Sequence, residues 1–92
     1  MVVKKNNSLG EFLKQKRVAA GLSQAEVAKQ FRYGSSQFIS NWERGLSSPP
    51  MNRFRKLCAL YNVSADEMFE QILTYRITEV TTDLKRKFYG RR

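Results

Sequence analysis

The residues with the clearest chemical capacity surround two large apolar side chains. Ile39 and Trp42 are three positions apart, so both face the same side of a helix. The side chains that then point outward are those of Ser36, Gln37 and Asn41. Glutamine and asparagine amides can form paired hydrogen bonds with N6 and N7 of adenine, and a serine hydroxyl can bond to most bases. This group is therefore suited to recognition through hydrogen bonds.

The rest of the composition argues against catalysis. The 92 residues contain no histidine for acid–base work and no glycine-rich phosphate loop. One cysteine, Cys58, cannot form an intramolecular disulfide or, without histidine, a zinc site. Within the apolar run 57–60 it is interpreted as a small buried hydrophobe rather than a reactive thiol. We predict that the protein is not an enzyme and uses no cofactor or metal ion.

The formal net charge of +9 favours a polyanionic partner, because basic side chains release the counterions condensed on phosphates. Residues 1–64 hold 11 basic and 3 acidic residues, residues 65–80 hold 1 and 4, and residues 81–92 hold 5 and 1. A basic surface that serves solubility alone is the alternative. No apolar run reaches the roughly 18 residues of a membrane span, and the first residues lack the apolar region of a signal peptide. We therefore expect a cytoplasmic protein, associated with the nucleoid when bound to DNA.

Helices are expected to position these groups. Ser8-Leu-Gly-Glu11, Ser23-Gln-Ala-Glu26 and Ser64-Ala-Asp-Glu67 each match a capping box, in which serine and glutamate satisfy free amides at a helix start. Gly21 and Gly45 stand where helices should end, since glycine adopts the left-handed conformation at little cost. The pattern predicts an all-α chain with helices over about 9–20, 24–31, 35–44, 51–61 and from 65 to about 89.

The second and third predicted helices are short and are joined by the tight turn at 32–34. A small residue, Ala28, allows them to cross closely, and together they form a helix-turn-helix pattern. In this arrangement one helix rests on the phosphate backbone while the next lies in the major groove of DNA.

Two stretches carry a family resemblance. Arg17-Val-Ala-Ala-Gly-Leu-Ser-Gln-Ala-Glu-Val-Ala28, followed by Ser40-Asn-Trp-Glu-Arg-Gly45, resembles the Cro and lambda-repressor-like (XRE-type) helix-turn-helix family. The resemblance covers about residues 8–70 and implies a five-helix domain that binds operator DNA as a dimer on an inverted repeat. The turn at 31–35 is one residue longer than in the shortest members. The first DNA-contacting residue of the third helix can therefore lie about one position earlier or later in the sequence.

With this register, the residues expected to read bases are Ser36, Gln37, Ser40 and Asn41. Those expected to meet the DNA backbone are Gln24, Arg44, Ser47, Ser48 and Arg53. The resemblance places Gln24 where its side chain meets a phosphate and can touch a side chain on the third helix; an exposed helix start is the alternative. Each long cation could instead be merely solvated. Phe38 could touch thymine methyl groups or cap the edge of the domain.

Arg17 and Glu43 lie on faces that are otherwise apolar. The resemblance implies that they form an ion pair tying the first helix to the end of the third, so both are assigned to structure rather than to DNA contact.

The chain is expected to divide into a basic arm over 1–7, the DNA-binding domain over 8–70 and a C-terminal extension over 71–92 that ends in a basic tail. The extension carries an apolar stripe with four-three-four-four spacing, formed by Leu73, Ile77, Val80, Leu84 and Phe88. We expect the stripe to form a homodimer interface; folding back over its own domain is the alternative. The β-branched cluster at 77–82 lowers the helix propensity, so a kink or a strand there is a further alternative.

These features indicate a transcriptional regulator that binds double-stranded DNA sequence-specifically, with repression by a homodimer as the leading interpretation. An antitoxin-type or adaptor protein, whose tail binds a protein partner, is the alternative. RNA binding is less well supported because exposed aromatic platforms of the usual kind are missing from the pattern.

Overall fold

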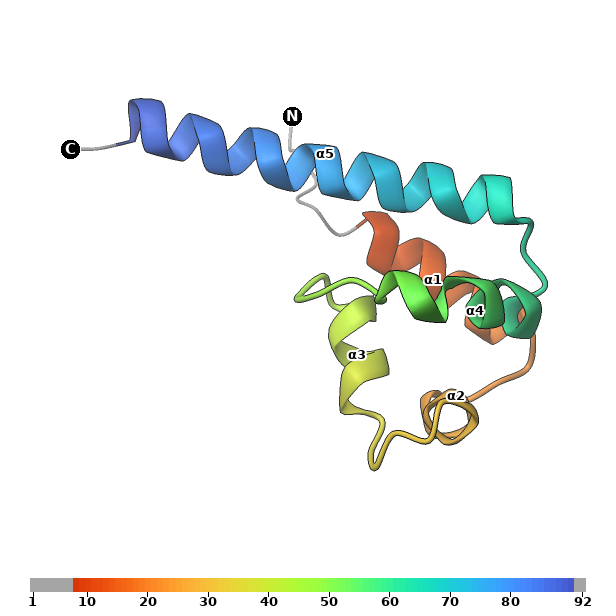
Figure 1. The fold of residues 1–92 in the computed structure, drawn as a ribbon. Helices are drawn as coiled ribbons and strands as arrows, with labels where there is room; N and C mark the ends of the chain where they lie inside the picture. The colour runs from red at the N-terminus through yellow and green to blue at the C-terminus, as the bar shows by residue number, and fades with distance from the viewer. Residues whose placement is uncertain (1–7, 91–92) are drawn as a thin grey trace.

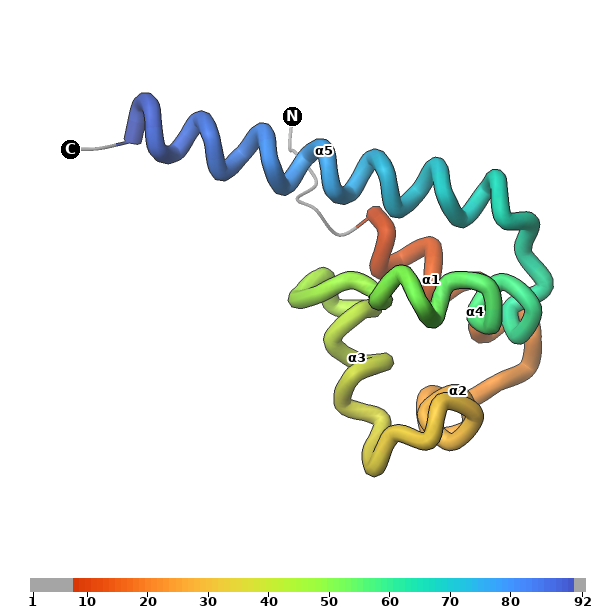
Figure 2. Tube along the Cα trace, in the orientation of Figure 1, coloured from red at the N-terminus to blue at the C-terminus, as the bar shows by residue number. Residues whose placement is uncertain are grey.

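The computed structural model describes residues 8–90, and these form helices and no strand. The elements are α1 (Ser8–Ala19), α2 (Gln24–Gln30), α3 (Gln37–Glu43), a 3-10 turn η1 (Met51–Arg53), α4 (Phe54–Tyr61) and α5 (Ala65–Tyr89), as Figures 1 and 2 show. The predicted all-α, five-helix fold is confirmed. The expected basic arm over 1–7 and the final two arginines lie outside the described residues.

Two of the three predicted capping boxes lie at helix starts. Ser23 Oγ accepts the amide of Glu26 at 3.0 Å, and Glu26 Oε1 accepts the amide of Ser23 at 2.8 Å, so this box is complete. Ser64 Oγ accepts the amide of Glu67 at 3.1 Å at the start of α5. The third box is wrong in position, because Ser8 is the first residue of α1 and not the residue before it.

Other helix limits differ from the prediction by one or two residues. Gly21 and Gly45 have φ of 75° and 80° and follow α1 and α3, as predicted from the conformational freedom of glycine. The third helix was predicted over 35–44, but Ser36 is its N-cap and Ser35 Oγ accepts the amide of Gln37 at 3.2 Å, so α3 begins at Gln37. The fourth helix was predicted from 51, but its first turn is the 3-10 turn η1, closed by the amide of Arg53 on the carbonyl of Pro50.

One apolar core joins all five helices. In Figure 1, α1 and α4 lie between α5 on one side and the α2–α3 pair on the other. The core contains Leu9, Leu13, Val27, Ala28, Phe31, Ile39, Trp42, Leu57, Cys58, Tyr61, Val63, Met68 and Ile72. Ala28 is buried where α2 meets α3, as its small size predicts. Cys58 is buried as well, and burial raises the pKa of its thiol, so the thiol stays protonated.

The C-terminal helix continues without interruption past the domain. α5 runs as one helix through the β-branched cluster, so neither a kink nor a strand forms there, and its last turns project beyond the other helices (Figure 1). The alternative in which the extension folds back over its own domain is wrong for this chain. The stripe residues are exposed, with relative accessibilities of 40% for Leu73, 55% for Ile77, 58% for Val80, 57% for Leu84 and 78% for Phe88.

A different face of α5 packs on the domain. Met68 and Ile72 are buried and Tyr75 is half-buried against the core, so the packing continues past the domain limit expected at residue 70. Across residues 8–90, no helix has both the length and the apolar composition that crossing a bilayer requires.

Candidate nucleic-acid interface

Four polar side chains of the α3 segment form a continuous hydrogen-bonded group, which we call the α3 network: Gln37, Ser40, Asn41 and Arg44. Gln37 Nε2 donates to Asn41 Oδ1 at 2.9 Å, and Arg44 Nη2 donates to the same oxygen at 2.8 Å. Arg44 Nε also donates to Ser40 Oγ at 3.2 Å. Gln37 and Arg44 are exposed, and Ser40 and Asn41 are half-buried. Three of the four predicted base-reading residues therefore lie in one network together with Arg44.

The network fixes which hydrogen-bonding atoms face outward. Asn41 Oδ1 already accepts two hydrogen bonds, so the Nδ2 donors of that amide are the part left for a further partner. The Gln37 amide uses a donor within the network and keeps its oxygen as an acceptor. The network thus offers an acceptor, an amide donor and guanidinium donors side by side, which is a pattern that base edges and phosphates can match.

The opposite side of α3 anchors this network. Ile39 and Trp42 are almost completely buried, as their spacing predicts. The Trp42 ring meets the rings of Phe31 and Tyr33 edge-on, at centroid distances of 6.2 and 6.1 Å. Edge-to-face contacts of this kind restrain the rotation of a helix about its own axis. The exposed side of α3 is therefore held in one orientation.

An aromatic group supports the turn between α2 and α3. Arg32 adopts a left-handed conformation with φ of 62°, and the amide of Tyr33 donates to the carbonyl of Ala28 at 2.9 Å. The ring of Tyr33 packs on that of Phe38 at 4.7 Å, while about half of the Phe38 side chain stays exposed. Phe38 thus packs against the turn through Tyr33 and remains half exposed at the surface.

Arg53 reaches this turn from the 3-10 turn. Its Nε donates to Tyr33 Oη at 3.3 Å, and its guanidinium carbon lies 5.5 Å from the Tyr33 ring centroid and 5.7 Å from that of Phe31. Such contacts hold a cation over aromatic faces without neutralising it. Lys56 donates to the carbonyl of Gln30 at 2.6 Å, which satisfies a free carbonyl at the end of α2.

Arg17 and Glu43 form a two-pronged ion pair between α1 and the end of α3, as the resemblance implies. Arg17 Nε lies 2.6 Å from Glu43 Oε2 and Nη2 lies 3.0 Å from Oε1, while Nη1 donates to the carbonyl of Leu22 at 2.9 Å. Both side chains are buried, and the hydrogen bond to Glu43 raises the pKa of Arg17 above its ordinary value. Gln24 Nε2 donates to Glu43 Oε1 at 2.9 Å, so Gln24 does touch a side chain on α3.

The remaining predicted site residues lie near α3 but outside the network. Ser36 is the N-cap of α3 and makes no side-chain cap hydrogen bond. Ser47 and Ser48 are half-buried in the loop that leads to the 3-10 turn. Sequence reasoning missed the link from Arg44 to Asn41 and the role of Tyr33 in the turn. The link from Arg44 to Asn41 could have been found from the sequence, because residues three positions apart on a helix are neighbours. No sequence pattern indicates the role of Tyr33.

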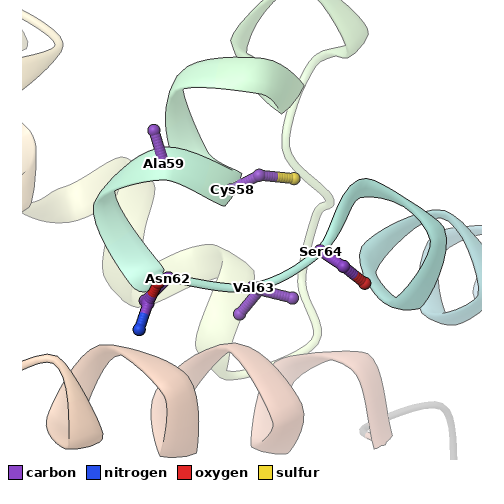
Figure 3. A pocket seen from close by; sticks show the side chains of 5 residues that line it. All are labelled: Cys58, Ala59, Asn62, Val63 and Ser64. Atoms are coloured by element: carbon purple, nitrogen blue, oxygen red, sulfur yellow. The ribbon is translucent and has the colours of Figure 1, made fainter.

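Other surfaces of the described residues offer less chemistry. The turn between α4 and α5 leaves a hollow lined by Cys58, Ala59, Asn62, Val63 and Ser64, which Figure 3 shows from close by. Its one thiol is kept protonated by burial, and its other polar groups are one amide and one hydroxyl. No group of acidic, histidine or cysteine side chains within residues 8–90 is arranged to hold a metal ion.

Comparison with known proteins adds three findings. A family model described as a helix-turn-helix domain matches residues 8–70. The chain is 42% identical over 59 residues to the HTH-type transcriptional regulator ImmR of Bacillus subtilis (strain 168), covering 64% of this chain and 46% of that relative. It is 33% identical over 78 residues to the HTH-type transcriptional activator BcrR of Enterococcus faecalis, covering 83% of this chain and 38% of that relative. The chain thus spans less than half the length of either relative.

Proposed function

This chain belongs to the helix-turn-helix domain family, and from that membership we propose that it is a transcriptional regulator whose α3 binds the major groove of double-stranded DNA sequence-specifically. The observation that carries the proposal is the exposed α3 network, which lies opposite the buried Ile39 and Trp42. The net charge of +9 supports a polyanionic partner.

The base-reading residues in this proposal are Ser36, Gln37, Ser40 and Asn41, with Arg44 beside them. Paired bonding of Asn41 to adenine would require its Oδ1, which two side chains already occupy in the free chain. In this proposal the Asn41 amide therefore donates from Nδ2 to a base acceptor, such as guanine O6 or N7 or thymine O4. The guanidinium of Arg44 has donors left for a neighbouring base or phosphate.

The backbone contacts in this proposal come from both sides of α3. Gln24 stands at the first position of α2, and Ser47, Ser48 and Arg53 follow α3 along the chain. Contacts to phosphates fix the position of the domain but carry no sequence information. Arg53 is already ordered by Tyr33, so its charge is in place before DNA arrives.

The assembly in this proposal is a homodimer on an inverted repeat, which the exposed stripe of α5 supports. Such a dimer bound at a promoter would block transcription, so we propose that the chain is a repressor. We also propose that it is located in the cytoplasm and, when bound to DNA, at the nucleoid. One relative is named as an activator, and a promoter–reporter assay with and without the chain distinguishes the two directions. The exposed stripe also favours a second candidate, an antitoxin-type or adaptor protein whose tail binds another protein.

Replacing Arg53 with alanine tests the backbone part of this function. We expect weaker binding to all DNA sequences alike, and a slope of log affinity against log salt that falls by about 0.9, because one phosphate contact is lost. Fluorescence anisotropy at several salt concentrations measures both. Thermal unfolding is recorded in parallel, since Arg53 also contacts Tyr33.

The matched control removes one positive charge elsewhere. Lys85→Ala removes an exposed lysine near the C-terminal end of α5, and we expect it to change the salt slope less than Arg53→Ala does. A change in relative preference between DNA sequences on replacing Arg53, or an unchanged slope, contradicts this assignment.

A further inference from the structure

α5 has two apolar faces, and the domain covers one of them. Met68 and Ile72 are buried against the core, whereas Leu73, Ile77 and Val80 are exposed. At 100° per residue, the exposed residues point about 100–160° away from the mean direction of Met68 and Ile72. The exposed face therefore cannot turn toward its own domain without pulling Met68 and Ile72 out of the core.

The spacing along this exposed face reads the same in both directions. Its positions, which we call the α5 seam, are Glu70, Leu73, Ile77, Val80, Leu84 and Lys87. The steps between them are three, four, three, four and three residues. This is the spacing of a coiled-coil seam. Because the spacing is symmetric, two antiparallel copies can pair so that each seam position lies opposite a seam position of the second copy. The paired length is about 26 Å, at 1.5 Å per residue.

The charges on the seam distinguish the two possible directions. Glu70 stands at one end and Lys87 at the other. In a parallel pair, Glu70 meets Glu70 and Lys87 meets Lys87, and both contacts are repulsive. In an antiparallel pair, each Glu70 meets Lys87 of the second copy, and both contacts are attractive.

The charges of residues beside the seam also favour the antiparallel direction. Arg76 and Asp83 flank the seam on the same side, and only the antiparallel pairing brings each next to the opposite charge of the second copy. More broadly, residues 65–80 carry 4 acidic and 1 basic residue, and residues 81–89 carry 1 and 3, so the basic end of one helix lies on the acidic half of the other.

The ion pairs that Lys87 makes within residues 8–90 are weak. Lys87 lies 3.5 Å and Arg86 3.7 Å from Asp83, but all three side chains are mostly exposed. Exposed ion pairs on a helix contribute little, so Lys87 is free to exchange Asp83 for a partner across the seam.

We propose that the partner of the exposed face is a second copy of this chain, and that the two α5 helices pair antiparallel through the seam. The apolar layers are Leu73 with Leu84 and Ile77 with Val80, each occurring twice, and Glu70–Lys87 pairs close both ends. The inference rests on the proposed function only for the expectation of a dimer; DNA reading by α3 does not depend on it.

Exchanging these two charges in the 92-residue chain tests the pairing by sedimentation equilibrium. In the antiparallel pair, Glu70→Lys brings two lysines together at both ends, so we expect the dimer dissociation constant to rise roughly tenfold, and Lys87→Glu should do the same. The double variant Glu70→Lys/Lys87→Glu restores opposite charges and is expected to return within about threefold of the original chain. Arg86→Glu is the control, because it reverses the neighbouring charge on the far side of the helix from the seam.

The outcomes separate the direction of pairing from the function. The antiparallel pairing is overturned if Glu70→Lys leaves the dimer dissociation constant unchanged. It is also overturned if the double variant dimerises as weakly as the single variants. If the 92-residue chain stays monomeric at millimolar concentration, the antiparallel pairing is overturned too, and the exposed face of α5 would instead bind a different protein. Binding to a DNA duplex with one half-site, measured by anisotropy on the same samples, reports on α3 alone. Circular dichroism melting confirms that each variant is folded.

Discussion

Replacing Glu43 with alanine is expected to lower the free energy of unfolding by about 3–5 kcal/mol, because it leaves the guanidinium of Arg17 buried without its counter-charge. The side chains of Arg17 and Glu43 are only 10% and 4% exposed, and two short contacts join them. The carbonyl of Leu22 is then the hydrogen-bond partner that Arg17 keeps within residues 8–90. Arg17 cannot escape by losing its proton, since arginine stays charged in proteins. Urea unfolding followed by the fluorescence of Trp42 measures the change.

Two variants serve as controls for this effect. Tyr61→Phe removes a buried hydroxyl that has no hydrogen-bond partner within residues 8–90 and whose pKa is raised, first by burial and then by the charge of Glu43. It strands no charge, so its effect on stability should stay within about 1 kcal/mol. The double variant Arg17→Met/Glu43→Leu removes both charges and should be less destabilised than Glu43→Ala. A loss below about 1 kcal/mol for Glu43→Ala would mean that water reaches Arg17 and that the pair adds little.

Replacing Asn41 with alanine is expected to cost about 1–3 kcal/mol of discrimination at one base position in each half-site, roughly a factor of 5 to 150 in relative affinity. Its effect should exceed that of Gln37→Ala, because Asn41 Oδ1 orients both Gln37 and Arg44. For the same reason the effects of Gln37→Ala and Asn41→Ala should not add in the double variant. Competition binding with duplexes that differ at single base pairs measures these preferences.

The control for the base readers is Gln15→Ala. It truncates an exposed glutamine on α1 and should leave every base preference unchanged. Equal base preferences in the original chain, Gln37→Ala and Asn41→Ala would show that a different part of α3 faces the bases.

The parts of the fold that follow local rules could be predicted from the sequence. The capping box at Ser23 needs only residues three positions apart, and Gly45 ends α3 because of its own backbone freedom. The inward side of α3 follows from the spacing of Ile39 and Trp42. These patterns are sufficient to identify the outward polar side of α3.

The parts that depend on contacts distant in sequence could not be predicted. Arg53 reaches Tyr33 across 20 residues, and no local pattern encodes that approach. The two apolar faces of α5 are hardly distinguishable by composition, since Met68 and Ile72 are no more apolar than Leu73 and Ile77. Which face the domain covers is decided by packing. The length of α3 was overestimated because Ser35 and Ser36 form the turn before the helix instead of its first residues.

The most direct test is selection of bound duplexes from random DNA at a fixed salt concentration, carried out in parallel with the original chain and with Asn41→Ala. We predict that the original chain enriches a motif with two inverted half-sites, and that Asn41→Ala loses the preference at one position of each half-site while the others persist. If the two proteins enrich the same motif with equal preference at every position, or if the original chain enriches none, α3 does not read DNA in the way proposed.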